Sequence, residues 1–209
     1  MTVAVSAAVM AHPSRSARAY RLAERLAVYR ARVVLDPEPD GPPSSLRTAR
    51  RAWAAVGDDA THHLVIQDDA VPLPSLEAAV ARAVASRRHD AVALFTEWGS
   101  YTSYALRLAA LAGEAYAPIL DRYVPSVALL LPAAVARDFA AATADGETKD
   151  DVALAGFLAG AGIPIAVAVP CPVDHRNPES LTGNGRMGDR KSTRLNSSHP
   201  SKSRMPSSA

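Results

Sequence analysis

Short apolar runs alternate with stretches of helical periodicity along the first hundred residues. The apolar runs, which predict strands, lie within 2–10, 32–35 and 90–96 and at 64–66. Between them, apolar side chains recur every three or four residues over 17–29, 45–55 and 75–86, as on the inner side of an amphipathic helix. This order predicts an α/β fold with a mostly parallel sheet and helices on both faces.

The second half of the chain is less regular. Strands are predicted at 124–131 and 163–169, and helices at 132–142 and 152–161. Residues 101–111 are predicted either as a helix or as a partly ordered segment, and 113–121 as a link. After the last strand, 170–175 is expected to return along the edge of the sheet.

One predicted strand ends in two adjacent acids. The apolar run 64–66 leads directly into Gln67, Asp68 and Asp69, and Pro72 stops the segment from continuing as a central strand. Two neighbouring carboxylates repel each other and are costly to desolvate, so we expect a cation beside them. A hard divalent metal is the natural candidate. The alternative is that both aspartates are solvated or cap the helix that follows.

Length and composition fit one globular domain. The chain has 209 residues, of which 48% are apolar and 21% charged. No apolar run is long enough for a membrane span, so we expect a cytoplasmic protein, with a location at the periphery of a membrane as the alternative. Cys171 is the only cysteine, which excludes an internal disulfide and a multi-cysteine zinc site. Among prolines and valines, it is interpreted as an apolar filler rather than a nucleophile.

The net charge of +2 comes from the end of the chain. Residues 191–209 hold four basic residues and no acid, and setting them aside changes the net charge from +2 to −2. We therefore predict no nucleic-acid partner. Residues 185–209 are predicted to be a disordered, non-native tail, because the end is rich in serine and resembles translated adapter or vector sequence. The domain is then 1–184, and we expect the natural C-terminus to be missing.

Three candidate segments fall at the same edge of the predicted sheet. Ligands of parallel α/β sheets bind outside the carboxyl ends of the strands. The turn 12–15, the loop that begins at Asp36, and the tip at Asp68 and Asp69 each follow a predicted strand. One pocket can therefore collect all three segments.

The acidic tip, with Asp150, Asp151 and His175, resembles the site of small glycosyltransferases of the GT-A (Rossmann-like) fold. That family carries an Asp-x-Asp motif at the end of a strand, and the resemblance covers about 3–184. The run HHLVIQDD also resembles a bacterial subgroup related to lipopolysaccharide sugar transferases. The resemblance implies transfer of a sugar from a nucleoside-diphosphate sugar to a hydroxyl, with Mn²⁺ or Mg²⁺ as cofactor. The acceptor, whether a glycan, a lipid-linked or a small molecule, is left open.

The resemblance implies that Asp69 and His175 bind the metal. In the family, the last acid of the motif binds the cation, which bridges the diphosphate, and a histidine late in the chain often completes the coordination. The family's first acid is replaced here by Gln67. This change removes one charge and either weakens the metal site or shifts ribose contacts to Asp68. A structural or exposed His175 is the alternative.

The resemblance also implies a general base at the start of the helix near 150. Asp151 is the first candidate and Asp150 the second, since such a base must reach the acceptor hydroxyl. Two acids in the first turn of a helix also suit its dipole, which is a sufficient structural reason for them.

Nucleotide contacts are expected from the first turn and the second loop. The residues that resemble the segment against the base and ribose are Ala11, His12, Pro13 and Arg15. Asp36 could accept a hydrogen bond from the base, and Arg15 or Arg51 could offset phosphate charge. For Arg51, a solvated helix face is the alternative. Trp98 and Tyr101 could stack on a sugar ring or seal a core.

Two other enzyme classes do not fit the sequence. A haloacid-dehalogenase-type phosphatase needs aspartate and threonine where Gln67 and Val71 stand, and no glycine-rich turn follows a strand, which argues against a P-loop or dinucleotide site. The remaining alternative is a non-catalytic or truncated GT-A-like domain that binds a nucleotide and transfers nothing.

Overall fold

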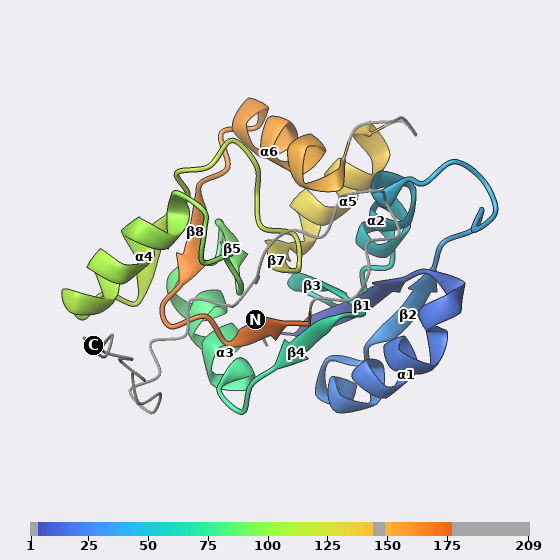
Figure 1. Ribbon diagram of the computed structural model, residues 1–209, viewed down its shortest axis with the longest axis horizontal. Helices are drawn as coiled ribbons and strands as arrows, with labels where there is room; N and C mark the ends of the chain where they lie inside the picture. Colours follow the sequence, from blue (N-terminus) through green and yellow to red (C-terminus); the bar gives the residue numbers. More distant parts are fainter. Residues whose placement is uncertain (1–3, 144–148, 177–209) are drawn as a thin grey trace, which may run out of the picture.

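A seven-stranded sheet in the order β2-β1-β3-β7-β5-β8-β6 forms the centre of the protein (Figure 1). The computed structural model describes residues 4–143 and 149–176, so the predicted tail 185–209 lies outside the described residues. The strands of the sheet are β1 (Val5–Ala11), β2 (Arg32–Leu35), β3 (His62–Gln67), β5 (Ala91–Ala93), β6 (Tyr116–Pro118), β7 (Ala128–Pro132) and β8 (Ile165–Ala168). β7 and β6 run against the other five, which confirms a mostly parallel sheet.

Helices cover both faces of this sheet. They are α1 (Ser16–Arg25), α2 (Ser45–Ala54), α3 (Leu76–Ser86), α4 (Thr102–Leu111), α5 (Ala133–Ala142) and α6 (Asp150–Gly160), with short 3-10 helices at Pro13–Arg15 and Ala27–Tyr29. α2, α5 and α6 pack on one face, and α1 and α3 on the other, while α4 lies at one end of the molecule (Figure 1). The α/β fold class is therefore confirmed. Within the described residues, no helix combines the length and apolar character needed to cross a membrane.

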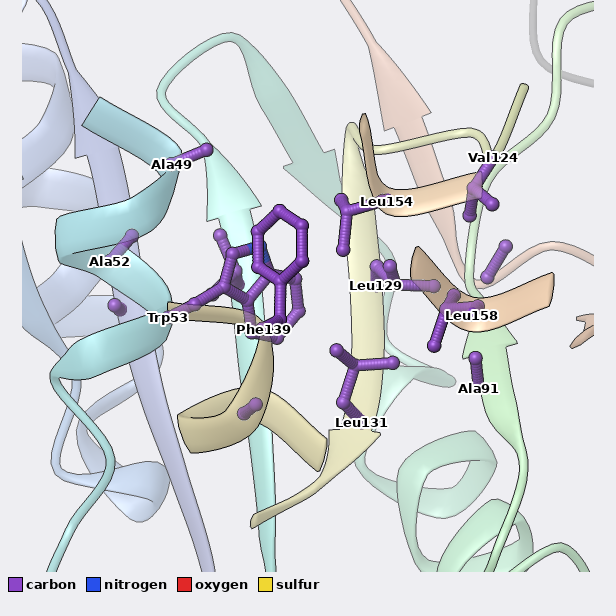
Figure 2. Close-up of a cluster of buried hydrophobic side chains, with 14 of the residues drawn as sticks. Ala49, Ala52, Trp53, Ala91, Val124, Leu129, Leu131, Phe139, Leu154 and Leu158 are labelled. Carbon is purple, nitrogen blue, oxygen red and sulfur yellow. The ribbon is translucent and has the colours of Figure 1, made fainter. Parts of the chain in front are cut away.

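The two faces explain why the strands are continuously apolar. Side chains of a strand alternate between faces. In β3, Leu64 and Ile66 pack against α1 and α3, while Val65 packs against α2 and α5. Because both faces of the sheet are buried, the side chains on both sides of a strand are apolar. The sequence of such a strand therefore shows no alternation of apolar and polar residues. On the α2 side, Trp53 and Phe139 lie beside Leu129 and Leu131 of β7 (Figure 2).

The second half departs from the simple strand and helix alternation. β7 lies between β3 and β5 and runs antiparallel to both, and the predicted link 113–121 contains the edge strand β6. A separate two-stranded sheet pairs β4 (Ala70–Pro72) with β9 (Val173–His175). An apolar run carries no information about strand direction, and strands of three residues are too short to show a period.

His63 is a structural residue of β3. Its side chain is fully buried, its Nδ1 lies 2.7 Å from Ser6 Oγ and its Nε2 lies 2.9 Å from the carbonyl oxygen of Ala52. Because a carbonyl can only accept, Nε2 carries the proton and Nδ1 accepts from the hydroxyl. Burial lowers the pKa of His63 from 6.5 to about 4, so the imidazole is neutral at pH 7.

Acid is expected to destabilise the fold through His63. Between pH 6.5 and 4 the unfolded chain binds a proton that the folded chain does not, so the unfolding free energy falls as pH falls. At about 1.4 kcal/mol per pH unit, the loss reaches about 3 kcal/mol at pH 4. Urea denaturation of the wild type and of His63→Gln at several pH values measures this loss, because the difference in unfolding free energy between the two proteins should change with pH. The exposed His89→Gln is the control, and a difference that does not change with pH would contradict this role.

Candidate functional site

The end of β3 lies at the carboxyl edge of the sheet, beside two neighbouring strands. The backbone N–H of Asp68 donates to the carbonyl oxygen of Met10 at 3.1 Å. On the other side, Gln67 Nε2 donates to Ser126 Oγ at 3.3 Å, just before β7 begins. Because β7 runs antiparallel, its first residues meet the last residues of β3. The acidic pair is therefore held by backbone and side-chain contacts from both sides.

Asp69 and His175 lie side by side although they are far apart in sequence. The pairing of β4 with β9 sets Ala70 opposite His175, which brings the imidazole to the acidic tip. Asp69 Oδ2 lies 3.1 Å from His175 Nε2, and the side chains are 11% and 6% exposed. The His175 ring also packs against Phe95, with 5.6 Å between ring centroids.

Asp68 faces two arginines instead. Its Oδ1 lies 3.8 Å from Arg15 Nη1, and Arg18 on the next turn adds a second positive charge nearby. Burial, and then the charge of Asp69, raise the pKa of Asp68 to about 6, while Arg15 and Arg18 partly oppose the shift. The fold thus separates the two acids, with Asp68 toward the arginines and Asp69 toward the histidine.

Several polar atoms of this cluster lack a partner. Among the residues that the structure describes, the atoms Asp68 Oδ2, Asp69 Oδ1, His175 Nδ1 and Arg18 Nη1 are buried without a hydrogen bond. Each such atom costs about 1–3 kcal/mol unless something else satisfies it. Within the described part of the chain, no group of three or more acid, histidine or cysteine side chains is arranged around one point. The cluster can therefore supply two protein ligands to a cation and needs further ligands from elsewhere.

The turn after β1 lies next to this cluster. His12 caps the short 3-10 helix, since its Nδ1 accepts from the N–H of Ser14 at 3.2 Å. Pro13 occupies the first position of that helix, and Ala11 accepts at its carbonyl oxygen from the N–H of Asp36 at 2.9 Å. The turn is thus tied to the second loop, and through Arg15 to the acidic tip.

Asp36 binds a side chain of α2, the helix that follows its loop. Arg47 donates from Nε to Asp36 Oδ1 at 2.8 Å and from Nη2 to Oδ2 at 2.9 Å. This bidentate pair is about 90% buried, and its hydrogen bonds lower the pKa of Asp36. Arg51, which was expected to offset phosphate charge, belongs to the same helix and is exposed.

Asp36→Asn is expected to destabilise the protein. Removing the charge leaves the buried guanidinium of Arg47 without its bidentate partner, which should lower the unfolding free energy by about 3 kcal/mol, the low end for a broken buried ion pair, because Arg47 keeps its contacts with Glu38. Urea denaturation at neutral pH measures the loss. Asp40→Asn, an exposed position of the same loop, should change stability by less than about 0.5 kcal/mol. Equal stability of the two variants would mean that Asp36 is free to contact a ligand.

Asp150 and Asp151 begin α6 at the same edge. The N–H of Asp150 donates to Ser45 Oγ at 3.2 Å, and its buried Oδ2 has no partner among the described residues. Asp151 Oδ1 accepts from the N–H of Val152 at 2.8 Å. Burial, and then the charge of Asp150, raise the pKa of Asp151. A raised pKa keeps a carboxylate more basic than in water.

One loop connects α6 with the strand tip. The N–H of Val124 donates to the carbonyl oxygen of Asp151 at 3.2 Å, and two residues later Ser126 accepts from Gln67. These contacts bring the acidic tip, the turn after β1, Asp36 and the start of α6 to one edge of the sheet. Asp36 is already paired there, and Arg51 is exposed further along α2.

Sequence reasoning missed two residues that the structure adds to the site. Arg18 comes three residues, about one helical turn, after Arg15, the residue that precedes α1. This spacing was the signal that both side chains lie on the same side of the start of the helix. Ser126 had no signal in the sequence, because only the antiparallel direction of β7 brings it to Gln67.

An open groove of about 870 Å³ lies at the opposite, amino edge of the sheet. Its walls include Tyr29, Asp58 and Glu77, and none of the predicted site residues lines it. This groove is therefore separate from the acidic tip.

Comparison with known proteins gives a fold but no family. No family model matches the chain, and no curated protein is similar to it in sequence. Among solved structures, it is similar to a protein from Bacillus anthracis assigned as a glucose-1-phosphate thymidylyltransferase and crystallised with sucrose. The two share 10% identity with a TM-score of 0.51, over 82% of this chain and 89% of the other. This likeness extends to the fold alone.

Proposed function

We propose that this protein is a metal-dependent glycosyltransferase that uses a nucleoside-diphosphate sugar. The observation that carries the proposal is the buried pair of Asp69 and His175, 3.1 Å apart, at the carboxyl edge of the sheet. The edge is where α/β sheets bind their ligands. The fold likeness to an enzyme named for nucleotidyl transfer to a sugar phosphate supports a nucleotide-sugar substrate.

The two side chains suit one Mn²⁺ or Mg²⁺ ion. Neighbouring ligands of an octahedral ion, each about 2.1 Å from it, lie about 3 Å apart. Mg²⁺ is usually held by one or two carboxylates plus water and substrate phosphates, and Mn²⁺ also accepts an imidazole. The unpartnered Oδ1 of Asp69 supports such a site. An Asp69–His175 hydrogen bond without metal is the competing interpretation.

The protein's own residues have separate roles in this proposal. When bound, the cation would stabilise the negative charge that develops on the leaving diphosphate. Arg15 and Arg18 offset phosphate charge from the side of α1, and Arg18 Nη1 is a buried donor with no partner in the described chain. Asp151 takes the proton from the acceptor hydroxyl, which its raised pKa favours.

Nucleoside diphosphates are expected to raise the melting temperature only when Mn²⁺ or Mg²⁺ is present. Uridine, guanosine, adenosine and thymidine diphosphates, each with metal or with EDTA, make up the screen. The nucleotide that stabilises most then selects the sugar nucleotides for a hydrolysis assay. A stabilisation that needs no metal would overturn the proposal.

The assay products distinguish the other functions. Release of a nucleoside diphosphate indicates glycosyl transfer, whereas pyrophosphate from a nucleoside triphosphate and a sugar 1-phosphate indicates nucleotidyl transfer. Metal-dependent binding without turnover of any donor would indicate the non-catalytic nucleotide-binding domain.

A further inference from the structure

The outer side of α4 is apolar and exposed. Its inner side is buried at Leu106, as expected for a helix that packs on a sheet. Its outer side carries Tyr104, Leu108 and Leu111, which are 58%, 69% and 85% exposed, and Tyr101 directly before the helix is 73% exposed. A helix that is apolar on both sides is normally covered on both.

The apolar surface continues beyond the helix. Trp98 is 48% and Leu120 is 55% exposed. The guanidinium of Arg107 lies 4.1 Å from the ring centroid of Trp98 and 4.7 Å from that of Tyr104, so it joins the two rings. The N–H of Leu120 donates to the hydroxyl of the first residue of α4 at 3.0 Å. We define the α4 patch as the six side chains Trp98, Tyr101, Tyr104, Leu108, Leu111 and Leu120.

The α4 patch is large enough for a stable interface. Its exposed fractions correspond to on the order of 800 Å², close to what one partner contributes to a standard-size protein interface. The largest apolar patch of an ordinary monomer is about 300–600 Å². Leaving this surface in water is therefore unusual for a monomer.

The spacing of the patch fits a second helix of the same kind. Tyr101, Tyr104, Leu108 and Leu111 follow one another at intervals of three, four and three residues, the spacing of the contact seam between two paired helices. In a twofold symmetric dimer the same surface meets itself, so a self-complementary stripe is sufficient. α4 lies at an end of the molecule, where a second copy can approach it (Figure 1).

Other occupants fit the patch less well. The segments outside the described residues, 1–3, 144–148 and 177–209, contain no run of apolar residues that could cover six large side chains. Helices that lie on anionic membranes combine an apolar side with many basic residues. The segment 97–122, which contains all six residues of the α4 patch, has two basic residues, Arg107 and Arg122, and three acidic ones, Glu97, Glu114 and Asp121, so it has no excess of positive charge.

We propose that the chain forms a twofold symmetric dimer in which α4 of one copy packs against α4 of the other. The proposal is independent of the glycosyltransferase function. Sedimentation velocity of the full chain at micromolar concentration should show a particle of about 44 kDa, twice the chain mass of 22.0 kDa.

Leu108→Glu should raise the dissociation constant of the dimer at least about 30-fold, because it places a charge in the centre of the apolar seam. Since Leu108 is 69% exposed, the monomer should fold as before, which circular dichroism and the melting temperature of the dissociated protein check. Val28→Glu is the matched control, an apolar residue 63% exposed on another surface, and should remain dimeric.

Two results would overturn the proposal. One is a wild-type protein that stays at 22.0 kDa at all concentrations. The other is a folded Leu108→Glu variant that dimerises as the wild type does. Co-sedimentation with equimolar phosphatidylcholine and phosphatidylglycerol vesicles is measured in parallel. A monomer that binds these vesicles through Leu108 would mean that the α4 patch contacts lipid instead of a second copy.

Discussion

Asp69→Asn is expected to remove most of the metal-dependent stabilisation by nucleoside diphosphates. Asparagine keeps the shape of the side chain and a hydrogen bond to His175, but it removes the charged oxygen ligand from the cation. Loss of a ligand should weaken metal-dependent binding at least about 100-fold, since even residues behind the ligands contribute 10–100-fold. The variant should therefore fold normally and bind much more weakly.

Thermal denaturation makes this effect measurable. At a ligand concentration 100 times the wild-type dissociation constant, binding stabilises the fold by about 2.7 kcal/mol, and a 100-fold weaker site reduces this to about 0.4 kcal/mol. For a protein of this size the melting temperature then rises by about 5–10 °C in the wild type and about 1 °C in the variant.

Asp59→Asn is the matched control, because Asp59 lies on the surface in an ion pair that is mostly exposed. Asp68→Asn should keep a metal-dependent shift, since Asp68 faces Arg15 and not His175. A full wild-type shift in Asp69→Asn would show that Asp69 and His175 form a structural pair without metal.

Asp151→Asn is expected to lower the rate of sugar transfer or donor hydrolysis by about 10²–10⁴-fold, the range of general acid–base catalysis. Binding of nucleotide and metal should not change, because Asp151 contacts neither in the proposed arrangement. A general base is inactive when protonated, and the pKa of Asp151 is raised above 3.8, so the wild-type rate should fall as the pH is lowered, already at pH values above 3.8. The rate of the variant should not show this fall at acid pH.

Initial rates between pH 4 and 8, with the sugar nucleotide selected by the stabilisation screen, test the prediction. Asp150→Asn provides the comparison, because its N–H and not its carboxylate makes the contact with Ser45. If both variants keep the wild-type rate, Asp150 and Asp151 only interact favourably with the dipole of α6, and the general base is another residue.

The position of the acidic tip in the fold was predicted best, because it depends on local sequence. Gln67, Asp68 and Asp69 come directly after the apolar run 64–66, which predicted a buried strand, and parallel strands share their carboxyl edge. Nothing local distinguishes the two acids, however. Their difference comes from Arg15 and Arg18 on one side and His175 on the other, and those neighbours belong to α1 and β9.

The pairing of Asp36 shows the opposite situation. In sequence it is one of several polar residues in a proline-rich loop, suited to contact a base. In the structure both carboxylate oxygens bind Arg47. The sequence could not show this pairing, because nothing in the pattern distinguishes Arg47 from Arg50 and Arg51 on the same predicted helix. Arg51, on the same helix, is exposed.

The sequence by itself determined the alternation of strands and helices, the burial of both sheet faces and the edge at which the acids lie. These properties follow from short-range periodicity and from the chirality and connection rules of α/β sheets. Only the tertiary structure decided the direction of β7, the β4 and β9 pair that brings His175 to Asp69, and the exposure of the α4 patch. Each of these depends on contacts between segments distant in the chain, whose free energy no local pattern encodes.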